Sequence, residues 1–551
     1  MNPLKFKPMF VALSLAMATT ASVTGAQGLP TITDNAKGTR ISVAQNVKER
    51  FPLYVGSSWN YNYDDESNYC KDKTYGFCGG KLTRTITRLV EINGHDAFEI
   101  VSSVTKPLGI LEKFPAITNL ADGGTEYWVM SNQCLAMAQQ GYYGLIESVK
   151  NATVVTMPTK PICVLRGLEN KESVYMTKDV TVTAKLNGNV FDTGTSAGYF
   201  TQYDDEATYS SASLYTRIGG SGAYTAKGLK VNLSAANSST MRLGLSLLNP
   251  GGLAGTETPV LTKNVGVTIG YASRLLFPVL LQSYNIPKSG LVASDNVTGL
   301  HWNAEESGWG INLNQQGKTI FATLFTYDAS GAPMWLVASD LQQDTATGHY
   351  TGALYKTRNP VPFQPISQSN VTAVGNMNLD FWGNGFAVVT YTVNGVEVSK
   401  QIKYQKFGQN RATCSNTNAL NRVGATNYQD LWWNPAESGW GVNLTHQDDT
   451  IFATLFTYKP SGDATWYVAS GMTKQADGSF TGDLYKTTGT AFNVEPVVPL
   501  TGANVVKVGT ASFKASNGEN GVFTHSVDGV SVTKNVQRQV FGATQFVCAK
   551  G

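Results

Sequence analysis

The C-terminal half of the chain contains one sequence pattern twice. Residues 302–327 read WNAEESGWGINLNQQGKTIFATLFTY, and residues 433–458 read WNPAESGWGVNLTHQDDTIFATLFTY. The likeness continues through GALYKT and GDLYKT and through VNGVEVSKQI and VDGVSVTKNV, and each copy ends on Phe-Gly and then a cysteine. Solenoid repeats span roughly 20 to 45 residues, so copies of this length are too long for a solenoid. We therefore expect two paired domains that share one fold.

Each copy has the alternation that is typical of β-strands. In IFATLFTY, Ile320 and Leu324 fall on one face while Phe321 and Phe325 fall on the other, and both faces are mostly apolar. The dipeptides Asn-Gly at 394–395 and Asp-Gly at 528–529 stand between alternating β-branched runs and predict two-residue type I′ hairpins. Roughly six to eight such segments in each copy favour an antiparallel barrel or sandwich. A strand that is apolar on both faces fits closure around a core or a ligand cavity.

The region before the repeats is also predicted to be β-rich. It carries Asn-Gly hairpin signals at 93–94 and 187–188. The chain has 55 glycines and only 15% charged residues, which argues against long salt-bridged helices. The predicted fold class is all-β, with an N-terminal β-rich domain followed by two homologous antiparallel β-barrel or β-sandwich repeats. The expected divisions are a signal peptide at 1–26, an N-terminal linker at 27–50, the β-rich domain at 51–288, repeat 1 at 289–414, a linker at 415–428 and repeat 2 at 429–551.

The first residues have the pattern of a secretory signal. Lys5 and Lys7 precede an apolar stretch, and a small-residue run follows with a candidate cleavage site after Ala26. We expect export to the periplasm or the extracellular space, with no transmembrane segment in the mature chain. The formal charge is +3 and the basic residues are scattered among almost as many acids, so no nucleic-acid partner is expected.

Six cysteines follow the candidate signal, and an even number in an oxidising compartment suggests disulfides. Proximity suggests that Cys70 pairs with Cys78 and Cys134 with Cys163, which leaves Cys414 with Cys548. Sequence alone leaves other pairings open. Because the last two cysteines occupy equivalent positions in the two repeats, a bond between them would join the repeat ends. A zinc site is the poorer alternative, since no CxxC pair exists and the five histidines are dispersed. No metal or other cofactor is predicted.

The motif WNxxESGWG resembles that of a group of exported bacterial proteins with tandem WWNPxESGWG units, each followed by an FATxFTY strand. The second copy matches the full pattern, whereas the first has His301 and Ala304 where the second has Trp432 and Pro435. The resemblance covers only the C-terminal half and implies no particular activity.

The repeated motif has two interpretations. In the structural one, its glycines adopt positive φ and its tryptophan closes a barrel end. In the functional one, Trp309 and Trp440 are stacking platforms for a sugar or another flat ligand, and Glu306 and Glu437 accept hydrogen bonds from it. Gln316 and Gln447 could add polar contacts. The full set of predicted ligand-binding residues is Trp302, Glu306, Trp309, Asn312, Trp335, Trp433, Glu437, Trp440, Asn443 and Trp466.

Catalytic motifs are weak. A glycosidase needs two suitably spaced carboxylates, and the repeats share one acid in this motif. Residues 194–198 match GxSxG but lack the strand-to-helix setting of a nucleophile elbow. We therefore predict no catalytic residues and expect a disulfide-stabilised binding or surface-interaction protein whose two aromatic-lined modules recognise a polysaccharide or cell-surface polymer. The alternatives are an extracellular hydrolase with its catalytic site in the N-terminal half, and a structural envelope protein.

Overall fold

The computed structural model describes the C-terminal half almost without gaps, at residues 278–417, 422–542 and 544–549. Before these it describes residues 32–34, 39–40, 43–63, 81–92, 95–105, 125–132, 134–142, 154–158, 162–166, 168–169, 172–186, 189–204, 223–226, 229–232, 240–247, 255–257, 260–262 and 264–271. The chain divides into two compact units, one covering residues 23–290 and the other containing residues 291–551. The fold is all-β, as predicted.

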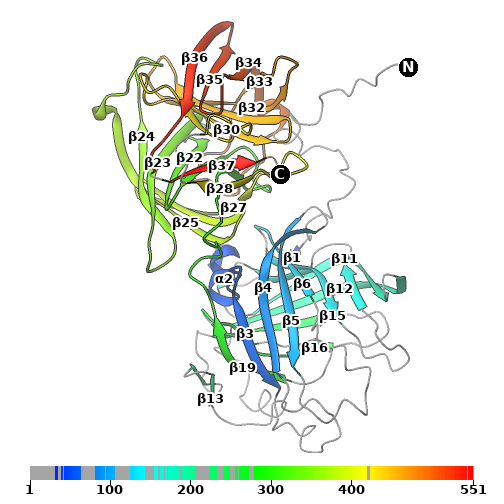
Figure 1. Ribbon diagram of the computed structural model, residues 1–551. Coiled ribbons are helices and arrows are strands. Elements are labelled where there is room, and N and C mark those ends of the chain that lie inside the picture. Colours follow the sequence, from blue (N-terminus) through cyan, green and yellow to red (C-terminus); the bar gives the residue numbers. More distant parts are fainter. Residues whose placement is uncertain are drawn as a thin grey trace, which may run out of the picture. The chain divides into compact units, whose positions relative to one another are not determined.

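The unit at residues 23–290 is built on one large antiparallel sheet (Figure 1). Its strands pair in the order β1-β11-β12-β15-β17-β18-β19-β3-β4-β5-β6-β7-β8, and β8 also pairs with β11. Strand β9 pairs with β7 and β16 with β15, while β10 pairs with β2 and β13 with β14. The strand bounds are β1 (Ile32–Asp34), β2 (Thr39–Arg40), β3 (Ser58–Tyr63), β4 (Lys81–Ile92), β5 (His95–Thr105), β6 (Thr125–Met130), β7 (Cys134–Tyr142), β8 (Val154–Pro158), β9 (Ile162–Arg166), β10 (Leu168–Glu169), β11 (Glu172–Leu186), β12 (Asn189–Asp204), β13 (Ala223–Ala226), β14 (Leu229–Asn232), β15 (Thr240–Leu247), β16 (Gly255–Glu257), β17 (Val260–Thr262), β18 (Gly266–Tyr271) and β19 (Pro278–Asn285).

One short helix, α2 (Val43–Arg50), lies next to this sheet and buries Val47. Phe51 follows it and stacks on Trp59 and Trp128, with ring centroids 6.1 and 5.2 Å away. Strands β4 and β5 are joined by two residues, as are β11 and β12, which confirms the hairpins predicted at 93–94 and 187–188. The turn residues themselves lie outside the described residues. Phe51, Trp59 and Trp128 are all buried, so this aromatic stack is part of the core of the unit.

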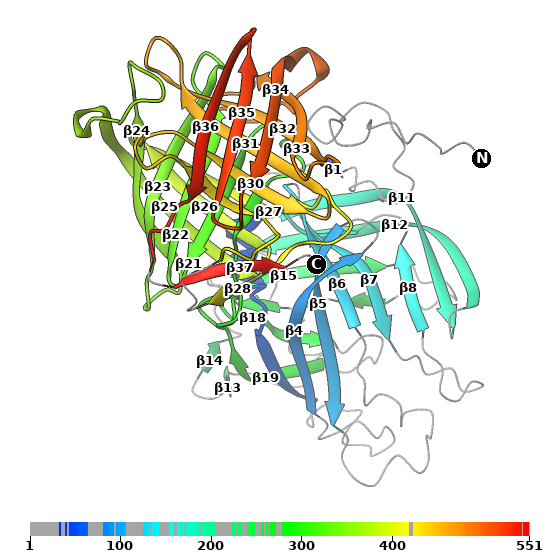
Figure 2. The ribbon, with the colours of Figure 1, turned by 45° about the horizontal axis from the view of Figure 1, so that its top comes forward.

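Each repeat of the C-terminal unit closes into an eight-stranded antiparallel barrel (Figure 2). The first contains β20 (Gly299–Trp302), β21 (Gly310–Gln316), β22 (Thr319–Tyr327), β23 (Pro333–Gln343), β24 (Tyr350–Thr357), β25 (Val371–Gly383), β26 (Phe386–Val393) and β27 (Val396–Tyr404). The second contains β29 (Asp430–Trp433), β30 (Gly441–Gln447), β31 (Thr450–Tyr458), β32 (Ala464–Lys474), β33 (Phe480–Thr487), β34 (Val505–Ala515), β35 (Asn520–Val527) and β36 (Val530–Arg538). Single 3-10 turns, η2 (Gln368–Asn370) and η3 (Gly502–Asn504), precede β25 and β34. The sequence left barrel and sandwich open, and the observed closure makes both repeats barrels.

The predicted hairpins of the barrels are present. Asn394 and Gly395 have φ of 51° and 84°, and Asp528 and Gly529 have φ of 49° and 84°. Positive φ at both central residues is what a type I′ turn requires, and its twist matches that of the flanking strands. These turns therefore fix the register of β26 with β27 and of β35 with β36.

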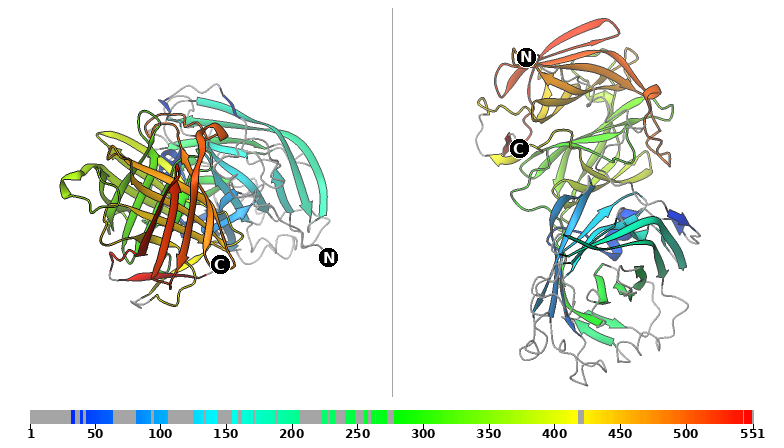
Figure 3. Two further views of the ribbon diagram at one scale, coloured as in Figure 1. Left: turned by 90° about the horizontal axis from the view of Figure 1, so that it is seen from above. Right: turned by 90° about the vertical axis from the view of Figure 1, so that its right-hand side faces the viewer.

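Side chains fill both barrels. In the first, Ile311, Leu324 and Phe381 are among the buried core residues, and in the second Val442, Leu455 and Phe513 take part in the corresponding core. The barrels lie against each other in both views of Figure 3, and a third apolar cluster contains residues of both. Strands β28 (Thr413–Thr417) and β37 (Gln545–Ala549), one after each barrel, pair antiparallel with each other. The predicted Cys414–Cys548 disulfide joins these two strands.

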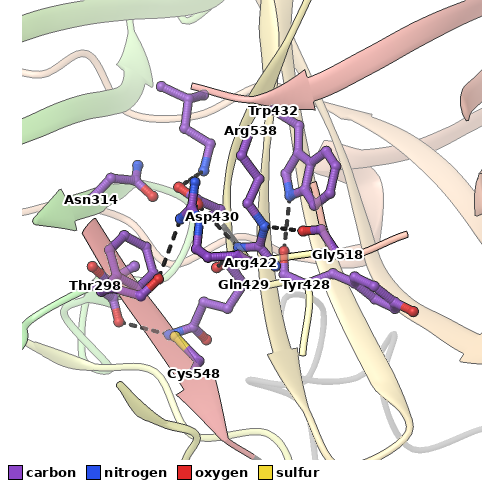
Figure 4. Close-up of polar contacts among 12 residues, drawn as sticks. Thr298, Asn314, Arg422, Tyr428, Gln429, Asp430, Trp432, Gly518, Arg538 and Cys548 are labelled. Atoms are coloured by element: carbon purple, nitrogen blue, oxygen red, sulfur yellow. Dashed lines mark hydrogen bonds and ion pairs between the residues drawn. The ribbon is translucent and has the colours of Figure 1, made fainter. Parts of the chain in front are cut away.

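A buried ion network lies at the start of the second barrel (Figure 4). Asp430 Oδ2 accepts hydrogen bonds from Arg422 Nη1 at 2.8 Å and Arg538 Nη1 at 3.0 Å, and all three side chains are almost completely buried. Glu519 accepts a further bond from Arg422 Nε at 3.1 Å, so the two positive charges face two negative ones. Arg422 also donates to the backbone oxygen of Phe546 in β37. The network therefore ties the linker, the barrel wall and the last strand together.

Candidate functional site

Two of the predicted ligand-binding tryptophans lie between the barrels. Trp335 and Trp466 are 2% and 3% exposed. The indole N–H of Trp335 donates to the backbone oxygen of Thr457 at 3.0 Å, and that of Trp466 donates to the backbone oxygen of Thr326 at 3.1 Å. The two contacts are equivalent under exchange of the repeats. These tryptophans therefore join one barrel to the other in the described structure.

The predicted asparagines also lie at this interface. Asn312 and Asn443 are 3% and 1% exposed, because the strand faces that point away from the barrel cores meet here. Asn443 Oδ1 accepts a hydrogen bond from Asn314 Nδ2 at 2.9 Å, and Asn312 Nδ2 lies 3.5 Å from Thr445 Oγ1. The structure thus brings both predicted asparagines together on a buried polar strip rather than on an open surface.

A glutamine of each barrel also accepts backbone hydrogen bonds from the segment that follows the other barrel. Gln447 Oε1 accepts the backbone N–H groups of Phe407 and Gly408 at 3.0 and 2.9 Å. Gln316 Oε1 accepts those of Phe541 and Gly542 at 3.0 and 2.9 Å. The interface is therefore isologous, with the same patch used on both sides, as in a two-fold dimer whose subunits have been fused.

The ESGWG turns lie where each barrel receives a loop of the other. Gly308 and Gly439 have φ of +121° and +101°, which favours glycine. Leu500, from the loop between β33 and β34, packs against Gly308, and Ile366, from the loop between β24 and β25, packs against Gly439. The backbone N–H of Ile366 donates to the oxygen of Ser438 at 3.1 Å. These contacts support the structural interpretation of the two glycines.

In the first barrel, the glutamate of the motif is fully engaged. Glu306 Oε2 accepts the indole N–H of Trp309 at 3.1 Å, and Lys400 Nζ lies 3.0 Å from the same carboxylate oxygen. Glu495, which comes from the loop of the second barrel, also pairs with Lys400. Trp309 is half-buried and packs against the barrel core. The polar groups of Glu306, Trp309 and Lys400 are therefore satisfied by one another and by Glu495 of the second barrel.

In the second barrel, the same two groups are not bonded to each other. Glu437 Oε1 pairs with Lys534 Nζ at 2.8 Å. Glu437 Oε2 and the indole nitrogen of Trp440 are both buried and have no hydrogen-bond partner among the described residues, and Trp440 is only 2% exposed. An acceptor and a donor that bond each other in one barrel are thus both unpaired in the other.

Two further side chains complete this end of the second barrel. Phe363, from the first barrel, lies edge-on to Trp440 with ring centroids 5.1 Å apart and lies 5.7 Å from His525. Lys534 Nζ is 5.1 Å from the centre of the Phe363 ring. Burial, with a smaller contribution from Lys534, lowers the pKa of His525 to about 4, so the imidazole is neutral at pH 7. Its Nδ1 is buried and unpartnered among the described residues. We call Phe363, Glu437, Trp440, His525 and Lys534 the second-barrel cluster.

The sequence did not single out Phe363, His525 or Lys534. Lys400 and Lys534 occupy the same place in VNGVEVSK and VDGVSVTK. A lysine that recurs at this place in an alternating apolar strand could have indicated that Lys534 belongs to the site. No sequence pattern indicated Phe363 as a site residue, because the residues that it contacts come from the other repeat.

The remaining predicted tryptophans stand apart from the cluster in the strand pattern. Trp302 and Trp433 end β20 and β29 and are half-buried. By strand alternation Trp433 faces away from the side that carries Trp432, which belongs to the second barrel core, and Trp302 faces away from the side that carries His301. A role in ligand binding stays a prediction for both.

The structure locates some of the other motifs noted in the sequence, and the rest lie outside the described residues. The GxSxG match at 194–198 lies inside β12, so it is not a strand-to-helix elbow. Cys134 is disulfide-bonded and buried. Cys163 lies in β9, which pairs with β7, but its side chain lies outside the described residues, as do Cys70 and Cys78. The pairings predicted for these four stay predictions.

In the described part of the chain, no three His, Cys, Asp or Glu side chains gather closely enough to hold a metal ion. Nor does any described helix combine the length and apolarity that crossing a bilayer requires. A scan against protein-family models and searches of curated proteins and solved structures gave no match to this chain.

Proposed function

We propose that the protein is an exported binding protein that recognises a polysaccharide or another hydroxyl-rich surface polymer through the second-barrel cluster. The observation that carries the proposal is the pair of buried, unpartnered groups at Glu437 and Trp440. Leaving such a group unpaired costs about 1–3 kcal/mol. Native structures rarely retain such groups without a functional reason or an additional polar partner.

The surroundings of these groups favour binding. Phe363 supplies partly exposed aromatic surface, whereas the buried Trp440 supplies its indole N–H. Glu437, Lys534 and His525 supply further polar groups on the same barrel end. A mostly apolar site with a few placed polar groups is the usual composition of a ligand site. The first barrel offers less, because Glu306, Trp309 and Lys400 already bond one another. The proposal therefore narrows the two related sites expected from the repeat to one site in the second barrel.

Export is supported by two independent features. The N-terminal sequence has the pattern of a signal peptide, and Cys414 and Cys548 form a buried disulfide. Disulfides persist mainly in oxidising compartments, which agrees with a periplasmic or extracellular location.

The test is a binding array of neutral and charged polysaccharides probed with the mature full-length protein. Intrinsic tryptophan fluorescence serves as a second readout. We expect saturable binding to at least one polymer, together with a shift in tryptophan emission as the environment of Trp440 changes. Folded protein that binds nothing across the array would overturn the proposal.

A further inference from the structure

The two barrel ends differ in net charge although their motifs are alike. In the first, Lys400 faces two carboxylates, those of Glu306 and Glu495. In the second, Glu437 is the one carboxylate paired with Lys534 among the residues that the structure describes, and the loop at 358–370 contains no acidic residue. The position of Tyr391 in the first barrel is taken by His525 in the second, and this imidazole is neutral at pH 7. The second-barrel cluster is therefore close to electrically neutral.

The unpaired atoms of the cluster define the chemistry of a complementary group. Such a group must accept a hydrogen bond from the Trp440 indole and donate one to Glu437 Oε2. A hydroxyl does both. An ionised carboxylate has no proton to donate, and both a carboxylate and a phosphate would bring negative charge next to that of Glu437. An ammonium group cannot accept from the indole. Nδ1 of the neutral imidazole of His525 can pair with a second hydroxyl as either donor or acceptor.

Phe363 belongs to a loop of the first barrel that is hydrogen-bonded to the second barrel. Its φ of +62° lies in the left-handed region, which costs a non-glycine residue about 1–3 kcal/mol. The loop is fixed on both sides of it: the Asn359 N–H donates to the Gly462 oxygen at 2.9 Å, and the Ile366 N–H donates to the Ser438 oxygen at 3.1 Å. Its counterpart Phe492, which packs against the first barrel core, is not among the residues with positive φ. Strain of this kind is concentrated at functional sites such as ligand clamps.

An aromatic face beside a hydroxyl-binding pair suits a sugar ring, whose C–H face is apolar and whose edge carries hydroxyls. We infer that the ligand is a neutral sugar bound by both repeats, with one sugar hydroxyl bridging Trp440 and Glu437 of the second barrel and the sugar ring contacting Phe363 of the first. The inference rests on the proposed function and adds the ligand class and the contribution of the first repeat.

The experiment is calorimetric titration of the full-length protein with cello-, malto- and manno-oligosaccharides and, for comparison, with acidic oligogalacturonides. We expect binding to at least one neutral series and none to the acidic one. In Trp440→Phe and Glu437→Gln, we expect the affinity to fall by about tenfold or more, since each loses a hydrogen bond to the shared hydroxyl. The glutamine oxygen can still accept from Lys534, so this variant tests the ligand contact more than the fold.

The contribution of the first repeat is tested with a matched pair. Phe363→Leu keeps an apolar side chain but removes the aromatic face, and Phe492→Leu makes the same change at the first barrel. We expect weaker binding only in the former, with thermal melts confirming that both variants are folded. Equal affinity in wild type and folded Phe363→Leu would overturn the composite site, and binding to the acidic series alone would overturn the neutral ligand. Both outcomes leave the proposed function standing, whereas absence of binding to any polymer in the array removes it.

Discussion

Replacing Gly308 by alanine tests whether the ESGWG turn is the receptor for the loop of the other barrel. A Cβ atom at this position would lie 2.6 Å from Cγ of Leu500 and 3.0 and 3.1 Å from its two methyl carbons. Leu500 is 2% exposed, so it has little room to move away. The backbone at Gly308 has φ of +121°, which an alanine adopts only with strain.

The expected cost has two parts. Backbone strain contributes about 1–3 kcal/mol. Overpacking against Leu500 contributes about 1–3 kcal/mol more. Gly478→Ala is the control, because Gly478 has φ of +81° and no atom within 4 Å of the added Cβ. Gly478→Ala has the backbone strain but not the overpacking. We therefore expect Gly308→Ala to be less stable than Gly478→Ala by about 1–3 kcal/mol.

Urea denaturation of the full-length protein with tryptophan fluorescence measures these differences. Leu500→Ala removes the atoms that the new methyl group would meet. The double variant Gly308→Ala with Leu500→Ala should therefore be more stable than the sum of the single effects by about 1–3 kcal/mol. Additive effects, or a Gly308→Ala variant as stable as Gly478→Ala, would refute the assignment of the turn as a docking surface for the loop.

Four other predictions concern the scaffold. Asp430→Asn leaves two buried arginines without their shared carboxylate and should cost about 3–5 kcal/mol in urea melts, whereas a loss below about 1 kcal/mol would contradict the network. Trp335→Phe and Trp466→Phe each leave a buried carbonyl unpaired and should each cost about 1–3 kcal/mol, with similar values if the interface is two-fold. Cys414→Ser opens a disulfide that spans 134 positions and should lower stability by about 2–5 kcal/mol, whereas unchanged melting would contradict its role. Burial lowers the pKa of His446 to about 4, whereas an unfolded histidine titrates near 6.5. The stability that the neutral imidazole provides is therefore complete above pH 6.5 and is lost as the pH falls towards 4. Thermal melts of wild type and His446→Gln between pH 7.5 and 4 should diverge in that window.

The features that depend on local pattern could be predicted from the sequence. Strand alternation gave the all-β class, and the Asn-Gly and Asp-Gly dipeptides gave the hairpins, because only a few residue types adopt positive φ cheaply. The Cys414–Cys548 pairing was predicted because proximity assigned the other four cysteines to each other, and the structure confirms this bond.

The features that depend on contact between the repeats could not be predicted. The strand IFATLFTY is apolar on both faces, and its second face packs against the other barrel. Trp335, Trp466 and both predicted asparagines belong to the same interface, although they resemble ligand contacts in the sequence. Composition does not distinguish a buried interface from a binding surface, since both need aromatic rings and paired polar groups.

The difference between the two ESGWG ends was also beyond the sequence pattern. The motif is identical in both repeats, yet Glu306 is bonded to Trp309 while Glu437 and Trp440 are not bonded to each other. The neighbour that differs is Glu495, which comes from a loop of the second barrel, whereas the corresponding loop of the first barrel, at 358–370, contains no acidic residue. Only the assembled pair of barrels determines which end has unpaired polar groups.

The most direct test of the account is one paired titration. The neutral oligosaccharide that binds best is titrated calorimetrically into wild type, Trp440→Phe and Trp309→Phe, all confirmed as folded. The account predicts that Trp440→Phe weakens binding by about tenfold or more while Trp309→Phe leaves it unchanged. Equal weakening by both variants, or weakening by Trp309→Phe alone, would contradict the assignment of the ligand site to the second barrel.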